Sequence, residues 1–229
     1  MLKKFVLWGH HLSDYCEMFD LLEQDLADKK IIEYGAGATS FNAQMHAKGR
    51  AVVSVDPLYA LPFDELKETV QDVFDTTVSK IKNNKDKYNW KNYGDLTALL
   101  EQRQQGIEQF LADFEQGKQQ GRYVSQLDNL QDYSFDLALI THHLFVNYGD
   151  KGASEHVALI LEMIRVAGEV RTFPLLNKYG QVSQLLGPVM QILQQKDIAL
   201  EVRQVASQLQ KAGNAMLRAW AVKCDVSES

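Results

Sequence analysis

Hydrophobic positions along the chain change their period several times, and the changes predict alternating strands and helices. Short apolar runs bounded by glycine or polar residues are typical of strands buried on both faces of a sheet. Apolar residues that recur every three or four positions indicate amphipathic helices, and they do so over 154–166 and 181–195. The predicted strands before the carboxyl-terminal pair cover 31–34, 52–55, 122–126, 135–141 and 169–173.

The carboxyl-terminal pattern differs from the rest. Two further strands are predicted over 199–205 and 215–222, joined by a short link that contains Gly213 and Asn214. A link of this kind suits an antiparallel hairpin, because a parallel crossover needs a dozen or more residues. The sequence therefore predicts an α/β fold with a Rossmann-like, doubly wound seven-stranded sheet that ends in an antiparallel hairpin. We expect 1–229 to form a single domain.

Two helical regions lie outside this regular alternation. An amino-terminal helix is predicted over 12–27, ahead of the first strand. After the second strand, about 60–120 predicts a helical insertion, since the gap is far longer than a usual crossover. Its first helix begins at Pro62, and its second carries an apolar stripe from Leu96 to Phe114. The insertion is either a structural buttress or the roof of a ligand site.

A glycine turn follows the first strand and carries the clearest chemical signal. Gly35 permits a sharp turn, and Gly37, which has no Cβ, lets a ligand approach the backbone. Ser40 stands where a dinucleotide fingerprint has its third glycine, and serine is a good helix N-cap. Asp56, nineteen residues after Gly37, has the spacing of an acid that binds ribose hydroxyls. Glu33 at the strand end suits an ammonium or sulfonium and repels a pyrophosphate.

These features favour S-adenosylmethionine over a nicotinamide dinucleotide as the ligand of the turn. An ordinary strand-to-helix turn with a surface aspartate is the alternative interpretation. The net charge of −6 argues against wide, nonspecific coating of nucleic acid. Cys16 and Cys224 are the only cysteines, which excludes a disulfide framework and favours a reducing compartment. The first apolar run is too short for a signal peptide and no run approaches a membrane span, so we expect a soluble, cytoplasmic protein.

Segments along the whole chain resemble a bacterial branch of the class I S-adenosylmethionine-dependent methyltransferases. The matching segments include Glu33-Tyr34-Gly35-Ala36-Gly37, Val53-Ser54-Val55-Asp56-Pro57 and Phe135-Asp136-Leu137-Ala138-Leu139. Further matches contain Trp8-Gly9, Asp14-Tyr15, Gly121-Arg122-Tyr123, His142 and Gly213-Asn214-Ala215. The chain departs from the general pattern at Thr39, where many members have a third glycine, and at Gln126, where an acid often meets the adenine.

The resemblance implies a set of cofactor-binding residues at the carboxyl edge of the sheet. Glu33, Gly35, Ala36 and Gly37 would lie near the methionine portion, and Asp56 with Pro57 near the ribose. The other implied residues are Gln126 and Leu127 at the adenine, Thr141 near the sulfonium, and Tyr15 from an amino-terminal segment that closes over the cofactor.

Two histidines after the fourth strand are the candidates for chemistry. Methyl transfer mainly requires alignment of the reactants, but an oxygen or ammonium acceptor must also lose a proton. His142 and His143 are the candidate bases, with packing at the strand end as the alternative for each. Convergence of His10, His11, His142 and His143 on a metal ion is the alternative, but nothing in the sequence fixes a ligand geometry, so no metal site is predicted.

The acceptor stays open among three hypotheses. The first is a small molecule held beneath the insertion and the amino-terminal helix. The second is RNA or protein, bound through a stretch that mixes lysines with Tyr88, Trp90 and Tyr93, although a solvated helix end explains that stretch more simply. The third is a non-catalytic S-adenosylmethionine-binding protein. The oligomeric state is not predicted.

Overall fold

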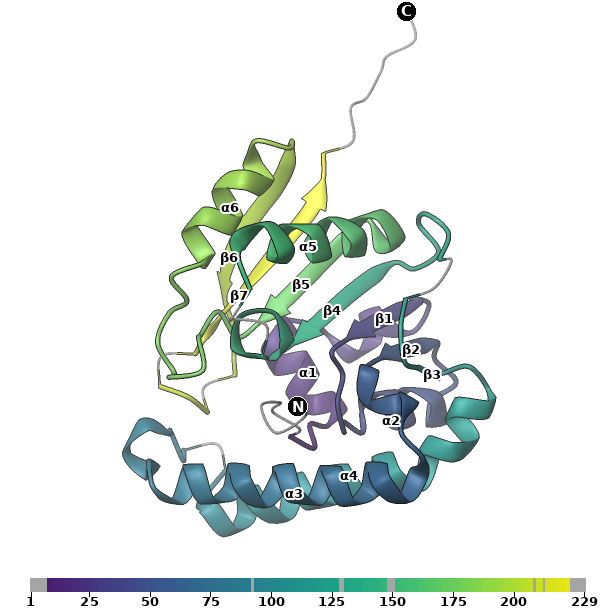
Figure 1. Cartoon of the computed structure of the whole chain (residues 1–229), viewed down its shortest axis with the longest axis vertical. Helices are drawn as coiled ribbons and strands as arrows, with labels where there is room; N and C mark the ends of the chain where they lie inside the picture. The colour runs from purple at the N-terminus through teal and green to yellow at the C-terminus, as the bar shows by residue number, and fades with distance from the viewer. Residues whose placement is uncertain are drawn as a thin grey trace, which may run out of the picture.

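The sheet of this protein is mixed and has seven strands. The computed structural model describes residues 8–91, 93–127, 130–147, 151–207, 209–211 and 213–222. The strand order is β3-β2-β1-β4-β5-β7-β6, in which β7 is antiparallel to both of its neighbours and the other pairs are parallel (Figure 1). This order confirms the doubly wound sheet with a carboxyl-terminal hairpin. The strands are β1 (Ile31–Tyr34), β2 (Val52–Val55), β3 (Tyr123–Val124), β4 (Leu137–Thr141), β5 (Glu169–Phe173), β6 (Ile198–Gln204) and β7 (Ala215–Ala221).

Helices pack on both faces of the sheet. Side chains of α5 and α6 share a core with one face, while α1 and α2 share a core with the other. The α-helices are α1 (Leu12–Phe19), α2 (Phe41–Ala47), α3 (Phe63–Lys82), α4 (Leu96–Gln119), α5 (Ala153–Ala167) and α6 (Leu186–Gln194). Shorter helical turns are η1 (Glu23–Leu26), η2 (Pro57–Ala60), η3 (Lys85–Lys87) and the π-helical turn η4 (His143–Asn147).

Burial on both faces explains why the central strands are continuous hydrophobic runs. In β4, Ala138 and Ile140 lie in the core beneath α5 and α6, whereas Leu137 and Leu139 lie in the core beneath α1 and α2. Alternate side chains of a strand point to opposite faces, so a central strand covered on both sides is apolar at most of its positions. The sequence pattern therefore located these strands to within a few residues.

The amino-terminal helix is shorter than predicted. The expected helix over 12–27 is wrong at its carboxyl end, because α1 ends at Phe19 and only the short turn η1 follows. Asp20 adopts a left-handed conformation (φ 50°), and its N–H bonds the carbonyl of Cys16. This residue closes the helix and turns the chain toward β1.

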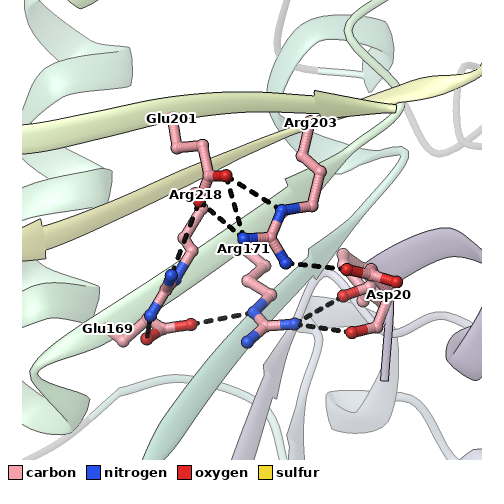
Figure 2. A network of polar contacts seen from close by, with 7 residues as sticks. Asp20, Glu169, Arg171, Glu201, Arg203 and Arg218 are labelled. Carbon is pink, nitrogen blue, oxygen red and sulfur yellow. Dashed lines mark hydrogen bonds and ion pairs between the residues drawn. The ribbon is translucent and has the colours of Figure 1, made fainter. Parts of the chain in front are cut away.

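An ion-pair network on the outer strands holds the end of α1 against the sheet. The Arg171 guanidinium on β5 donates to the carbonyl oxygens of Phe19 (2.7 Å) and Asp20 (3.0 Å). Arg203 on β6 reaches the Asp20 carboxylate at 2.7 Å. Figure 2 shows how these contacts continue across the hairpin through Glu169, Glu201 and Arg218. The network fixes α1, which carries two residues of the candidate site described below.

The helix predicted over 181–195 also begins late, at Leu186. The preceding residues form a tight turn, with a bridge between Leu176 and Val182. The Asn177 side chain accepts hydrogen bonds from the N–H groups of Tyr179 (2.9 Å) and Gln181 (3.2 Å). These side-chain bonds satisfy the backbone in a turn and so compete with a helix at the same positions.

The insertion consists of the two long helices α3 and α4, which run side by side below the carboxyl edge of the sheet (Figure 1). Within the described ranges, none of the helices combines the length and the apolar character that a bilayer crossing requires.

Two glycines allow α4 to pack directly against the backbone of the amino-terminal segment. A Cβ on Gly106 would overlap the carbonyl of Gly9, and one on Gly9 would overlap the carbonyl of Arg103. The absence of side chains at both positions permits this backbone contact.

Replacing Gly106 with alanine tests whether this contact positions the insertion. We expect Gly106→Ala to lower the free energy of unfolding by about 1–3 kcal/mol, because the new methyl group meets backbone that has little room to move. The matched control is Gly187→Ala in α6, where a Cβ meets nothing. That change should be neutral or stabilising by up to ~1 kcal/mol, as helix propensity dictates. Urea unfolding measures both, and an equal response of the two variants would contradict the packing described.

Candidate functional site

The glycine turn joins the ends of β1 and β2. Gly35 and Gly37 both have positive φ, at 67° and 63°. The Gly35 N–H donates to the carbonyl of Val55 at 2.8 Å, which holds the start of the turn against β2. The Gly37 N–H donates to the Asp56 carboxylate at 2.9 Å, and the Gly37 carbonyl accepts from the Tyr59 hydroxyl at 2.7 Å. The glycine turn and the downstream acid, which the sequence indicated separately, are therefore in direct contact.

Asp56 also shapes the segment that follows it. Its second carboxylate oxygen accepts from the Leu58 N–H at 2.8 Å, which caps η2 at Pro57. Burial raises the pKa of Asp56, and the two backbone hydrogen bonds oppose that rise. A carboxylate offers about four acceptor positions, so each oxygen keeps capacity for one further donor.

Glu33 lies inside the protein, below the turn. Its side chain is fully buried and accepts hydrogen bonds from Tyr15, from Thr39 (3.1 Å) and from Ser54 (2.8 Å). Burial raises the pKa of Glu33 to about 7, although the hydroxyl groups of Ser54 and Thr39 oppose the rise. Glu33 is therefore a junction between elements, and Thr39, which departs from the family pattern, supplies one of its partners.

Tyr15 shares this internal position. Its side chain is fully buried, its ring stacks on Phe41 with centroids 4.1 Å apart, and its hydroxyl donates to Glu33. In this arrangement Tyr15 and Glu33 connect α1 to β1, and they lie outside the lining of both cavities described below. Ser40 takes the N-cap position of α2 as expected, but its hydroxyl bonds the carbonyl of His10 at 3.1 Å instead of capping the helix.

His143 covers the start of the glycine turn. A Cβ on Gly35 would overlap the His143 side chain, whose ring is nearly perpendicular to the Tyr34 ring with centroids 5.1 Å apart. Burial, followed by the effect of nearby His156, lowers the pKa of His143 to about 4. The side chain thus packs against the turn, and it lies outside the lining of the main cavity.

The main cavity lies at the carboxyl ends of β4 and β5 and has a volume of about 370 Å³. Residues of α1, α3 and α4 line it together with residues at the ends of these strands, so the insertion and the amino-terminal helix both border it. Its most polar wall contains His10, Asp14, Arg103 and His142.

His142, one of the two candidate bases, lines this cavity. Thr141 ends β4 directly before it and is buried, in register with Phe173 on β5. His142 has φ 47°, a conformation that non-glycine residues seldom adopt, and its N–H donates to the Phe173 carbonyl at 2.7 Å. Such backbone conformations concentrate at functional sites. Burial lowers the pKa of His142 well below its ordinary value, with further lowering by His10 and Arg103, so the ring is neutral at pH 7.

A buried ion pair closes one side of the cavity. Arg103 of α4 forms a two-pronged contact with Asp14 of α1, in which one guanidinium nitrogen lies 2.8 Å from Oδ1. Burial alone raises the pKa of Asp14, but its contacts with His10 and Arg103 outweigh this effect and hold the pKa well below its usual range. Breaking a buried pair by removing one partner is strongly destabilising, so this contact fixes the insertion to the amino-terminal helix.

His10 and His142 stack with ring centroids 5.1 Å apart. Burial, assisted by Arg103, lowers the pKa of His10 to about 4. Neither ring nitrogen of His10 has a hydrogen-bond partner among the described residues, and its Nδ1 lies 3.8 Å from the Asp14 carboxylate, which is beyond hydrogen-bond distance. His11 points elsewhere, to the Gln102 carbonyl (2.7 Å) and the Gln44 side chain (2.9 Å), so the four histidines do not converge on one point.

A second hollow of about 360 Å³ runs along β2 and β3, from Gly121 before β3 to Leu127 after it. Gln126 and Leu127, predicted to edge the adenine, both line it, and so does Val55, which directly precedes Asp56. The other lining residues are mainly apolar. Within the described parts of the link between β3 and β4 there is no helix to cover this part of the sheet.

The sequence interpretation missed several residues of the main cavity, among them Asp14 in its ion-paired role and Arg103. One signal for Arg103 was available. It falls on the apolar stripe of α4, four residues after Leu99 and four before Ile107, and all three are buried. A charged residue at such a position requires a buried partner.

The buried Glu33 carboxyl predicts a specific pH dependence of stability. In the folded chain the Glu33 carboxyl keeps its proton up to about pH 7, whereas in the unfolded chain it loses the proton near its ordinary pKa of 4.5. The folded state therefore binds more protons between these values, and stability falls as the pH rises through this window. Glu33→Gln removes the titration. Its unfolding free energy relative to wild type should rise by about 3 kcal/mol from pH 4.5 to pH 8 in urea unfolding. A difference that stays constant with pH would refute the burial of this carboxyl.

Comparisons with known proteins identify relatives at low similarity. No family model matches the chain. It is 27% identical over 218 residues to an uncharacterised protein of Methanocaldococcus jannaschii, a match that covers 94% of this chain and 96% of that protein. A solved S-adenosylmethionine-dependent methyltransferase of Methanosarcina mazei is 12% identical with a TM-score of 0.45, covering 88% of this chain and 98% of the other. One of Aquifex aeolicus is 14% identical with a TM-score of 0.43, covering 92% and 97%.

Proposed function

We propose that the protein is an S-adenosylmethionine-dependent methyltransferase that acts on a small-molecule acceptor. The observation that carries the proposal is the hydrogen bond from Gly37 to Asp56, 2.9 Å long. It joins the glycine turn after β1 to the acid after β2, the two elements with which Rossmann-like sheets hold the ribose of a nucleoside ligand. An ordinary turn with a surface aspartate does not explain an acid that is buried against the turn.

The sheet topology supports the same location. The chain crosses from β1 to β2 on one side and returns to β4 on the other, so the strand order reverses between β1 and β4. Ligands of open α/β sheets bind at the carboxyl ends of the strands beside such a switch point. The glycine turn, Thr141 and His142 all lie at this edge.

The residues of this edge fit an adenosine-type cofactor at two places. Asp56 keeps acceptor capacity for ribose hydroxyls, and the apolar hollow that Gln126 and Leu127 line suits an adenine ring. Because His143 covers Gly35, we expect Ala36 and Gly37 to be the residues of the turn that contact the methionine portion of the cofactor. Glu33 and Tyr15 would act from below by holding the turn in place. When bound, the cofactor supplies a methyl group activated by its sulfonium.

The main cavity is the proposed acceptor site. The chain's own contribution there is to orient the acceptor, exclude water and receive a proton. His142 is the proposed base, because it lines the cavity and burial keeps its imidazole neutral. Its low pKa makes it a weak base, which suits an acceptor whose own hydroxyl is acidic. His143 does not line the cavity, and we assign it no proton transfer.

An RNA acceptor has less support. The aromatic residues of the stretch between α3 and α4 are directed inward rather than outward. Tyr88 and Tyr93 line the cavity, and the indole N–H of Trp90 donates to the Lys85 carbonyl at 3.2 Å. Stacking of single-stranded bases needs exposed rings. The third hypothesis, cofactor binding without catalysis, is separated from the first by turnover with an acceptor.

Ligand-induced stabilisation tests the cofactor. At ~100 times its dissociation constant, S-adenosylmethionine or S-adenosylhomocysteine should raise the free energy of unfolding by ~2.7 kcal/mol, whereas NADH should leave it unchanged. Thermal unfolding with the three ligands side by side measures this effect. Stabilisation by NADH alone would show that the turn holds a dinucleotide instead.

A substitution at Asp56 locates the cofactor. Asp56→Asn keeps the size of the side chain but replaces one charged acceptor oxygen with an NH₂ group, so we expect at least tenfold weaker binding of S-adenosylhomocysteine in calorimetry. Asp72→Asn, in an exposed position of α3, is the matched control and should bind like wild type. Equal affinities of the two variants would place the ligand away from the glycine turn.

A further inference from the structure

The charge of the main cavity differs from that of the whole chain. The protein carries a net charge of −6. The cavity lining nevertheless contains Lys80, Arg103 and Lys178 against one acidic residue, Asp14. Since Asp14 and Arg103 neutralise each other, the positive balance of the lining rests on Lys80. A positive cavity in a negative protein concentrates anionic ligands.

The two lysines come from separate elements at the rim. Lys80 lies in the last turn of α3, and Lys178 lies in the turn that precedes α6. No ion pair joins Lys80 to an acidic side chain in the part of the chain that the structure describes, and its ammonium is exposed. An anionic group that enters the cavity mouth is therefore met from the side of the insertion as well as from the side of the sheet.

Aromatic rings form much of the remaining lining. Trp8, Tyr88, Tyr93 and Phe173 contribute rings from three different parts of the chain. Burial raises the pKa of Tyr93 to about 12, so its phenol is neutral at pH 7. Rings of this kind stack on or meet the edges of a planar ligand. At about 370 Å³ the cavity has the volume of a small-molecule site.

The histidine pair supplies the third feature. His10 and His142 are both neutral at pH 7 and offer ring nitrogens to a hydroxyl group without adding charge. His10 has no hydrogen-bond partner among the described residues. A buried imidazole with neither nitrogen satisfied is costly, and a polar group of a ligand would relieve that cost.

We infer that the main cavity binds a small aromatic acid, with its ring among the aromatic side chains, its anionic group at Lys80 and Lys178, and a hydroxyl group at the histidine pair. The inference rests on the proposed function, because it names the class of acceptor that the methyltransferase takes. It excludes a cationic amine and a polymeric nucleic acid as the occupant. Lys80 and Lys178 are the residues that determine specificity.

Three probes that share one ring and differ in charge test the inference. They are para-hydroxybenzoate, para-hydroxybenzamide and tyramine, titrated into the full-length protein without cofactor and followed by calorimetry and by tryptophan fluorescence, which Trp8 in the cavity wall reports. We expect the benzoate to bind about tenfold more tightly than the amide, and tyramine to bind most weakly. Raising the salt concentration should reduce the difference in affinity between the benzoate and the amide, because the lysines are exposed and their charges are screened.

Lysine variants tie the preference to the cavity. Lys80→Gln should weaken binding of the benzoate about threefold, as expected for an exposed charge, and Lys80→Gln combined with Lys178→Gln about tenfold. Lys82→Gln is the matched control, since Lys82 is exposed on the same helix but does not line the cavity. It should leave the affinity unchanged, and none of the three variants should alter binding of the amide.

Several outcomes would overturn the inference. These are equal affinity for benzoate and amide, tightest binding of tyramine, absence of binding by all three probes, or tighter binding of a single-stranded RNA oligonucleotide with the same dependence on Lys80. Calorimetry with S-adenosylhomocysteine on the same preparations separates this result from the proposed function. A protein that discriminates among the probes but does not bind S-adenosylhomocysteine would retain the aromatic-acid cavity and lose the assignment as a methyltransferase.

Discussion

The Glu33 carboxyl is the constraint on which the candidate site depends. It is buried at the end of β1 and accepts hydrogen bonds from Tyr15 of α1, from Thr39 in the segment before α2 and from Ser54 of β2. A buried carboxyl is costly unless its oxygens are satisfied, so each partner must occupy its place. The position of the glycine turn relative to α1 and β2 thus follows from one side chain. Its raised pKa is the consequence of placing this junction in the core.

Two regions with different chemistry lie at the carboxyl edge of the sheet, next to the Glu33 carboxyl and its partners. On one side, Asp56 and the hollow beside Gln126 offer an acceptor carboxylate and an apolar surface. On the other side, the main cavity contains the histidine pair, aromatic rings and exposed lysines. His143, in the π-helical turn η4, packs between β4 and the glycine turn. The division suits an enzyme that must hold a nucleoside cofactor and a separate acceptor side by side.

Much of the fold was predictable because the central strands are covered on both faces. The runs that become β1, β2 and β4 are mainly apolar for that reason, and the short link at Gly213 indicates the hairpin. The sequence also indicated Gly37 and Asp56, each as a ligand contact, and the structure brings these two residues together.

The errors concern contacts between residues far apart in sequence. The left-handed Asp20 ends α1, with Arg171 and Arg203 from the distant outer strands holding that end, and no local pattern predicts this arrangement. Glu33 was expected to face a ligand, but three hydroxyl groups hold it in the core, two of them more than fifteen residues away on α1 and β2. Arg103 belongs to the site only because α4 of the insertion packs against α1. Such pairings depend on tertiary structure, and the periodicity of hydrophobic residues indicates only local secondary structure.

A crystal structure of the protein with S-adenosylhomocysteine would locate the cofactor relative to the glycine turn. We expect the ribose hydroxyls within hydrogen-bond distance of Asp56, the adenine beside Gln126 and Leu127, and the sulfur atom directed toward the cavity that His142 lines. A ligand bound wholly inside the aromatic cavity, with Asp56 bonded only to the N–H groups of Gly37 and Leu58, would contradict this expectation.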